Sequence, residues 1–244
     1  MNQEAILESI KKVREISKKR KFPQSFDLII NLTQLDIKNP NDKIDLFVIL
    51  NHPKGKTPKI CALVGSELES KAKIFDKVIN KDEFPQYQKD IKKVKKLARE
   101  YDYFIAQANL MGEIAAAFGK GLGTVGKMPN PKAGCIVPPV IPKLDPIKEK
   151  LNKTIRLLTK DQLIIKSIIG KEDMKDEEIA ENIQTAYSAL LHALPKEMNN
   201  LKSVFIKLTM SPSVEITDKG PVLHKKIEEP KENEKDTGKE NKGS

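Results

Sequence analysis

Apolar residues in this 244-residue chain follow two patterns, and the order of those patterns constrains the fold more than any other feature. Residues 26–32 and 44–50 alternate apolar and polar side chains, which is typical of strands with one buried face. The runs KICALVG (residues 59–65) and YFIAQA (residues 103–108) are almost continuously apolar, which favours strands covered on both faces. Residues 204–208 alternate again. The pattern of half-buried strands therefore occurs toward both ends of the chain, and the pattern of fully buried strands lies between them.

Helical spacing of apolar residues separates these strands. Helices are predicted over residues 2–19, 67–76, 86–100, 110–118 and 176–194. Further strands are predicted at 78–80, 154–159 and 162–169. The first two alternating strands are expected to be antiparallel, and residues 154–159 and 162–169 are two further strands.

Buried strands that alternate with helices indicate a parallel sheet with helices on both faces. We therefore predict an α/β chain with two domains. The first is discontinuous and combines residues 1–62 with residues 154–218, and the second, residues 63–153, is inserted into it. Residues 219–244 contain seven Lys, six acidic residues and few aliphatic ones, so a disordered tail is predicted there.

Charge and composition narrow the class of function. With 44 Lys and Arg against 34 Asp and Glu, the net charge is +10, which favours polyanionic partners. Eight Phe, four Tyr and no Trp give poor support to a single-strand binder built on stacking aromatics. Cys61 and Cys135 are too few for a disulfide scaffold or a zinc site, and no apolar run could span a bilayer. No leader is expected at the N-terminus, and neither a metal nor a cofactor is predicted.

The segment from Gly121 to Gly126 matches G-x-G-x-x-G, and with Lys127 it resembles the start of a phosphate-binding loop. Such loops follow a strand and open a helix, whereas here a helix is predicted before the glycines and Met128-Pro129 follows them. A nucleotide-binding enzyme is therefore only an alternative. The expectation is a loop with unobstructed backbone amides, in which Lys120, Lys127 and Lys132 contact a phosphate chain as a secondary site.

The helix over 86–100 carries a dense group of cations. They are Lys89, Lys92, Lys93, Lys95, Lys96 and Arg99. This pattern suits either a solvated face or a contact with RNA phosphates. The histidines are scattered and no catalytic arrangement of side chains stands out, so we predict that the chain is not an enzyme.

Three segments resemble a known family. They are Phe104–Ala133, which ends in GKGLGTVGKMPNPKA, Lys207–Pro212 (KLTMSP) and Lys21–Asn31 (KFPQSFDLIIN). Together they are similar to the first-numbered protein family of the large ribosomal subunit, and KFPQSF is closer to its archaeal members. The similarity extends over about residues 2–217.

The resemblance implies a discontinuous α+β sandwich domain with an inserted Rossmann-like α/β/α domain. It implies a cytoplasmic, ribosome-associated protein that binds rRNA at the mobile stalk and assists release of deacylated tRNA from the exit site. Repression of the protein's own mRNA, a monomeric state away from the ribosome, no membrane contact and no enzymatic activity are also expected. A free regulatory RNA-binding protein is the other alternative.

The resemblance also implies where RNA is bound. The expected contacts are Lys21, Phe22, Ser25, Asp27, Lys207, Thr209, Met210, Ser211 and Pro212, with Lys166 and Lys171 as further phosphate contacts. Ser211 stands where the family has Gly, and Gly suits a close approach or a positive φ. Asp27 would be repelled by phosphates, so it is expected to accept from a ribose hydroxyl or an exocyclic amine, or to orient a nearby Lys.

Overall fold

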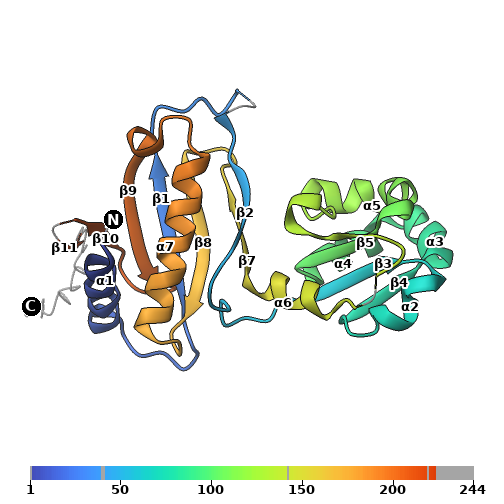
Figure 1. Ribbon diagram of the computed structural model, residues 1–244, viewed down its shortest axis with the longest axis horizontal. Coiled ribbons are helices and arrows are strands. Elements are labelled where there is room, and N and C mark those ends of the chain that lie inside the picture. The colour runs from blue at the N-terminus through green and yellow to red at the C-terminus, as the bar shows by residue number, and fades with distance from the viewer. Residues whose placement is uncertain (1, 40–41, 142, 219, 224–244) are drawn as a thin grey trace, which may run out of the picture.

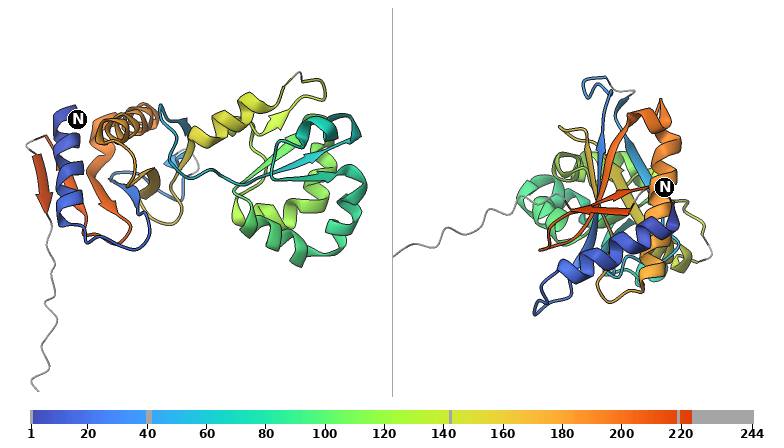
Figure 2. Two further views of the ribbon diagram at one scale, coloured as in Figure 1. Left: turned by 90° about the horizontal axis from the view of Figure 1, so that it is seen from below. Right: turned by 90° about the vertical axis from the view of Figure 1, so that its left-hand side faces the viewer.

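The structure is a computed structural model, and it describes residues 2–39, 42–141, 143–218 and 220–223. Its strands form two units that lie side by side and are joined by two chain segments (Figures 1 and 2). The first unit holds an antiparallel five-stranded sheet in the order β11-β10-β9-β1-β8. Its strands are β1 (Ser25–Leu32), β8 (Ile164–Lys171), β9 (Leu201–Leu208), β10 (Val214–Thr217) and β11 (Gly220–Leu223).

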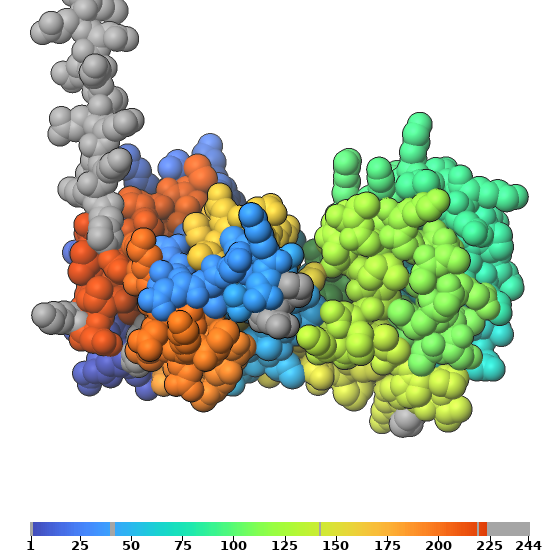
Figure 3. Space-filling view, turned by 90° about the horizontal axis from the view of Figure 1, so that it is seen from above, coloured from blue at the N-terminus to red at the C-terminus, as the bar shows by residue number. Residues whose placement is uncertain are grey.

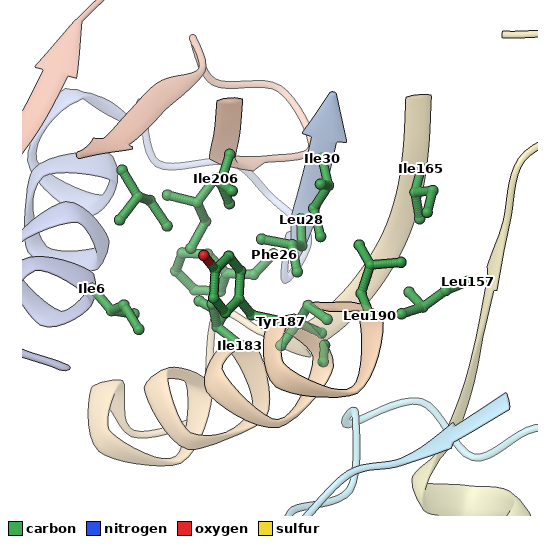
Figure 4. Close-up of a cluster of buried hydrophobic side chains, with 14 of the residues drawn as sticks. Ile6, Phe26, Leu28, Ile30, Leu157, Ile165, Ile183, Tyr187, Leu190 and Ile206 are labelled. Atoms are coloured by element: carbon green, nitrogen blue, oxygen red, sulfur yellow. The ribbon is translucent and has the colours of Figure 1, made fainter. Parts of the chain in front are cut away.

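Two helices cover one face of this sheet. They are α1 (Gln3–Ile16) and α7 (Asp176–Ala193), and Figure 1 shows α7 lying across β1 and β8. Every second residue of β1 is buried, and Phe26, Leu28 and Ile30 enter one apolar cluster with α7 residues (Figure 4). Burial of each such side chain stabilises the fold by about 1.5–3 kcal/mol. The alternating pattern therefore records which face of the sheet is covered.

A small antiparallel sheet of β2 (Asp45–Ile49) and β7 (Thr154–Leu158) completes the first unit. The short 3-10 helix η5 (Glu197–Asn200) precedes β9. The predicted strands are present, but their predicted pairing is wrong in detail. β1 pairs with β8 and β9, and β2 pairs with β7, so the two strands expected to be antiparallel at 26–32 and 44–50 do not pair with each other. Alternation reveals the buried face of a strand but carries no information on its partner.

The second unit has a parallel four-stranded sheet in the order β4-β3-β5-β6. These strands are β3 (Ile60–Val64), β4 (Lys77–Asn80), β5 (Tyr103–Gln107) and β6 (Ile136–Val137). Its helices are α2 (Ser66–Ala72), η2 (Lys81–Glu83), α3 (Phe84–Lys89), α4 (Ile91–Glu100), η3 (Ala108–Leu110), α5 (Met111–Val125), η4 (Pro131–Ala133) and α6 (Asp145–Lys153).

All five residues of β3 are buried because helices cover both faces of this sheet. Cys61 and Leu63 join a cluster with α3, α4 and α5, whereas Ile60, Ala62 and Val64 join a second cluster with α2 and α6. The result is the predicted three-layer α/β/α arrangement, and the predicted fold class is confirmed. The expected boundary between residues 62 and 63 falls inside β3, however, so the parallel sheet starts at Ile60.

The predicted tail starts too early. Residues Gly220–Leu223 form β11, which pairs with β10 at the edge of the large sheet. The strand contains Pro221 and Val222, although the segment that follows it in sequence is rich in charged residues. Residues 219 and 224–244, to which the prediction of disorder also applies, lie outside the described residues. In the part of the chain that is described, no helix combines the length and hydropathy that crossing a bilayer requires.

Candidate nucleic-acid interface

The start of β1 and the turn after β9 come from opposite ends of the chain and lie next to each other. Phe26 is in register with Leu208. Beyond this pair, the Thr209 amide donates to the Ser25 carbonyl at 3.1 Å, and the Ser25 amide donates to the Thr209 hydroxyl at 3.2 Å. The structure therefore brings together the two segments in which most of the predicted RNA contacts lie. We call residues 21–25 and 209–212 the turn surface.

Two large apolar side chains are exposed on the turn surface. Phe22 is 51% exposed and Met210 is 59% exposed. Lys21, Thr209 and Pro212 are also exposed. An apolar patch among polar groups is typical of a surface that meets a ligand, and a Phe ring and a Met side chain can lie against ribose or a base.

Gln24 is buried within this surface, with 1% of its area exposed, and its side chain and backbone together contact three other segments. Its Oε1 accepts from the Met210 amide at 3.1 Å, and its Nε2 donates to the Ser17 hydroxyl at 3.2 Å. Its backbone amide donates to the Glu172 carboxylate at 3.0 Å, and its carbonyl accepts from the Glu172 amide at 2.8 Å.

The sequence interpretation missed Gln24, although a signal was present. Residues 24, 26, 28, 30 and 32 share the buried phase of β1, and Gln24 is the one polar residue in that phase. A polar side chain in a buried phase needs hydrogen-bond partners, because an unpaired buried amide costs about 1–3 kcal/mol. A polar residue at such a position therefore indicates a side chain that hydrogen-bonds to neighbouring segments.

Ser211 takes part in the turn itself. Only 9% of the residue is exposed, and its hydroxyl accepts from the Leu208 amide at 2.8 Å. Its own amide donates to the Leu208 carbonyl at 2.9 Å. Among the described non-glycine residues, only Gln34 and Glu197 have a positive φ, so the turn does not require Gly at position 211. The serine closes the turn, and its hydroxyl faces inward rather than toward a ligand.

Asp27 lies opposite Lys207 in the pairing of β1 and β9. Burial raises the pKa of the Asp27 carboxyl, and the positive charge of Lys207 opposes that rise. That Asp27 orients a nearby Lys stays a prediction, and Lys207 is its cross-strand neighbour. Both side chains belong to the sheet face that α1 and α7 leave uncovered.

On the other side of β1, Lys171 is in register with Ser25, whereas Lys166 is in register with Ile29. Lys171 therefore lies beside the turn surface. Lys166 is four residues further along β1, which is about 13 Å at the usual strand rise. It lines a cleft of about 1090 Å³ between the two units, which Figure 3 shows as a hollow.

A smaller groove of about 400 Å³ adjoins Phe22. Lys19, Arg20 and Lys21 line it together with Glu172 and Asp173. Lys19 and Arg20 are not among the RNA contacts expected from the sequence. Their place beside Phe22 extends the positive part of the turn surface.

The glycine-rich segment does not form the expected loop. Helix α5 continues to Val125, and Gly126 ends it with a φ of 71°. Gly121 is buried, and a Cβ there would lie 2.3 Å from Cγ1 of Val94. The Lys127 Nζ donates to the Tyr101 carbonyl at 2.8 Å, whereas Lys120 and Lys132 are exposed. Gly121 permits close packing of α4 on α5, and the segment forms a helix end rather than a phosphate cradle, which removes the basis for a nucleotide site.

The two cysteines are not arranged as nucleophiles. Burial raises the pKa of the Cys61 thiol to about 12 and that of the Cys135 thiol to about 11, so both are neutral at physiological pH. Within the described ranges, no group of His, Cys, Asp and Glu is placed to hold a metal ion.

Comparison with known proteins accounts for this architecture. The model of the Ribosomal protein L1p/L10e family matches residues 11–212. The chain belongs to this family. Members are ribosomal proteins rather than enzymes, so the resemblance seen in the sequence is confirmed and the enzymatic alternative is set aside.

Archaeal members of the family align with most of the chain. The protein called large ribosomal subunit protein uL1 in Methanobrevibacter smithii is 42% identical over 218 residues, which cover 88% of this chain and 100% of that protein. The uL1 proteins of Methanothermobacter thermautotrophicus and Nanoarchaeum equitans are 39% and 40% identical, over 88% and 86% of this chain and 99% and 98% of their own lengths. The predicted similarity to archaeal members is thus confirmed.

Proposed function

We propose that this protein is a structural component of the large ribosomal subunit in the cytoplasm, and that it binds a folded element of large-subunit rRNA at the mobile stalk. The observation that carries the proposal is the pairing of Thr209 with Ser25, which joins the two predicted segments into one surface. Family membership and the names of the archaeal relatives support the ribosomal role.

Recognition would depend mainly on shape. Lysines beside the turn surface neutralise phosphates, and the exposed Phe22 and Met210 meet ribose and base edges. Met210 is held by Gln24, and the whole turn is closed by Ser211, so its shape is set before RNA arrives. A preformed surface loses little conformational entropy when it binds RNA, so less of the binding free energy is offset.

The family resemblance extends the proposal to two further roles. One is contact with exit-site tRNA during its release, and the other is repression of the protein's own mRNA through a similar RNA fold. The alternative is a free regulatory RNA-binding protein. Sedimentation through a sucrose gradient separates these, because a subunit component travels with the large subunit and a free protein stays at the top.

The test of the rRNA surface is filter binding to a stalk rRNA fragment. Replacing Thr209 and Met210 together by Ala should lower affinity by about 1–3 kcal/mol, the scale of a single readout contact. The control replaces Thr185 and Met198 by Ala, because these two residues lie on α7 and η5, away from the turn surface. Equal affinity of the two double variants would contradict the proposal.

A further inference from the structure

One strongly charged surface is not used by the proposed rRNA site. Five of the ten residues of α4 are cationic. Val94, Leu97 and Ala98 are buried against the rest of the second unit. The opposite side carries four exposed cations, which we call the α4 face: Lys92, Lys95, Lys96 and Arg99.

These cations lack acidic partners. Elsewhere, Lys12 pairs with Glu15 at 3.1 Å and Lys81 pairs with Glu113 at 2.7 Å. Among the described residues, no carboxylate oxygen lies within 4.0 Å of a cation of the α4 face. The nearby Asp90 instead caps the helix, accepting from the Lys92 amide at 3.0 Å.

The arrangement opposes the stability of the helix. Lys92 and Lys96, and likewise Lys95 and Arg99, are four residues apart, a spacing at which like charges repel. The first turn of α4 carries Lys92 and Lys93 and no acidic residue, so these cations meet the positive end of the helix dipole, which the N-cap carboxylate of Asp90 offsets in part. Both unfavourable effects would be relieved by a polyanion lying along the helix.

The surroundings of the α4 face leave room for a long ligand. Helix α5 packs on α4 at Gly121, whereas a Cβ added at Gly119 or Gly123 of α5 would meet no atom within 4 Å. Lys120 is exposed between these glycines. Figure 3 shows extended side chains, in the green of the α3–α4 segment, that stand away from the body of the second unit.

We propose that the α4 face is a second RNA contact, which binds the phosphate backbone of a double-helical segment of rRNA. This inference rests on the proposed function, because it assigns a further part of the same RNA to the second unit. From Lys92 to Arg99 the face is about 10 Å long at the rise of an α-helix, long enough to meet several phosphates of a duplex.

The residues of α3 and α4 favour contact with the RNA backbone over contact with RNA bases. In α3 and α4, Phe84 is buried and the ring of Tyr87 lies 5.2 Å from that of Phe118, so neither aromatic ring stands free for stacking. Stacking on exposed aromatics is what single-strand binding uses. Duplex RNA is recognised chiefly through phosphates and ribose hydroxyls, which lysine and arginine can reach.

The experiment compares two variants of equal charge. One carries Lys92→Gln, Lys96→Gln and Arg99→Gln, and the control carries Lys143→Gln, Lys196→Gln and Lys202→Gln, three exposed residues elsewhere in the chain. Binding to intact large-subunit rRNA and to the minimal stalk fragment is measured by filter binding between 0.05 and 0.3 M KCl. Thermal unfolding by circular dichroism checks that both variants are folded.

For intact rRNA, the α4 variant should bind about tenfold more weakly than the control at 0.1 M salt. Its slope of log K against log[salt] should be smaller by about 2.7, the value for three lost phosphate contacts. The minimal fragment should bind both variants equally, and a Lys92→Arg, Lys96→Arg variant should bind intact rRNA like the wild type.

Equal affinity and equal salt slope for the α4 variant and its control would overturn the inference. The cations of the α4 face would then contact only solvent. Normal rRNA binding combined with loss of the α4 variant from large subunits would also overturn it, in favour of an acidic protein partner. The proposed function fails separately, when the wild type shows no specific binding to the stalk fragment.

Discussion

The side-chain carbonyl oxygen of Gln24 accepts a hydrogen bond from the backbone amide of Met210, 186 residues further along the chain, at 3.1 Å. This bond connects the residue before β1 to the exposed turn after β9. The Met210 side chain itself is 59% exposed. The geometry of the candidate interface therefore depends on this buried amide together with the Thr209–Ser25 pairing and the hydrogen bonds of Ser211.

Replacing Gln24 by Leu should lower the free energy of unfolding by about 1–3 kcal/mol, because the partners of the amide lose their hydrogen bonds in a buried setting. The Met210 amide should exchange with solvent faster, and affinity for the stalk rRNA fragment should fall while the salt slope is unchanged. Hydrogen exchange, urea denaturation and filter binding measure these three effects. The control is Gln88→Leu at an exposed position, and unchanged exchange at Met210 would show that Gln24 does not hold the turn.

Replacing Ser211 by Gly should destabilise the fold by about 1 kcal/mol, since the Leu208 amide loses its acceptor and the turn has no need of a positive φ. RNA affinity should stay within about twofold of the wild type, because the serine hydroxyl faces inward. Thermal unfolding and filter binding test the two parts. A large loss of affinity without loss of stability would indicate that Ser211 touches RNA directly.

Replacing Asp27 by Asn should stabilise the protein at neutral pH. The pKa of the Asp27 carboxyl is raised above 3.8 by burial, so the folded state holds the proton more tightly than the unfolded state does. The stability that this difference contributes is full below pH 3.8 and is lost as the pH rises through the raised pKa. The gain from Asn should therefore grow from acid to neutral pH in unfolding measurements. A gain that is the same at every pH would exclude this cause.

Replacing Gly121 by Ala should destabilise the second unit by about 1–3 kcal/mol, because the added Cβ overlaps Val94 and overpacking costs that much. Gly119→Ala and Gly123→Ala are matched controls on the same helix, where the Cβ meets nothing, and they should stabilise it by about 0.4–1 kcal/mol. Urea denaturation compares the three. A loss of RNA binding in all three variants with normal stability would restore the idea of a phosphate-contacting loop.

Periodicity identified most of the strands correctly but not their neighbours. Alternation in residues 26–32 and continuous burial in residues 59–65 follow from how many faces of each sheet are covered, a property that each segment carries alone. Whether β1 pairs with β2 or with β8 depends on long-range packing, and no local pattern encodes it. The loop predicted at residues 121–126 is wrong for a related reason. The glycine motif is equally compatible with a loop and with close helix packing.

The sequence by itself determined the fold class, the positive charge and the family, because burial patterns, composition and the segments KFPQSF and KLTMSP are local and can be read in order. Only the tertiary structure decided that Gln24 holds Met210, that Ser211 faces inward, and that Lys171 rather than Lys166 lies beside the turn. These facts depend on which strand lies beside which. That choice is made by the apolar core as a whole, through contacts between residues far apart in the chain.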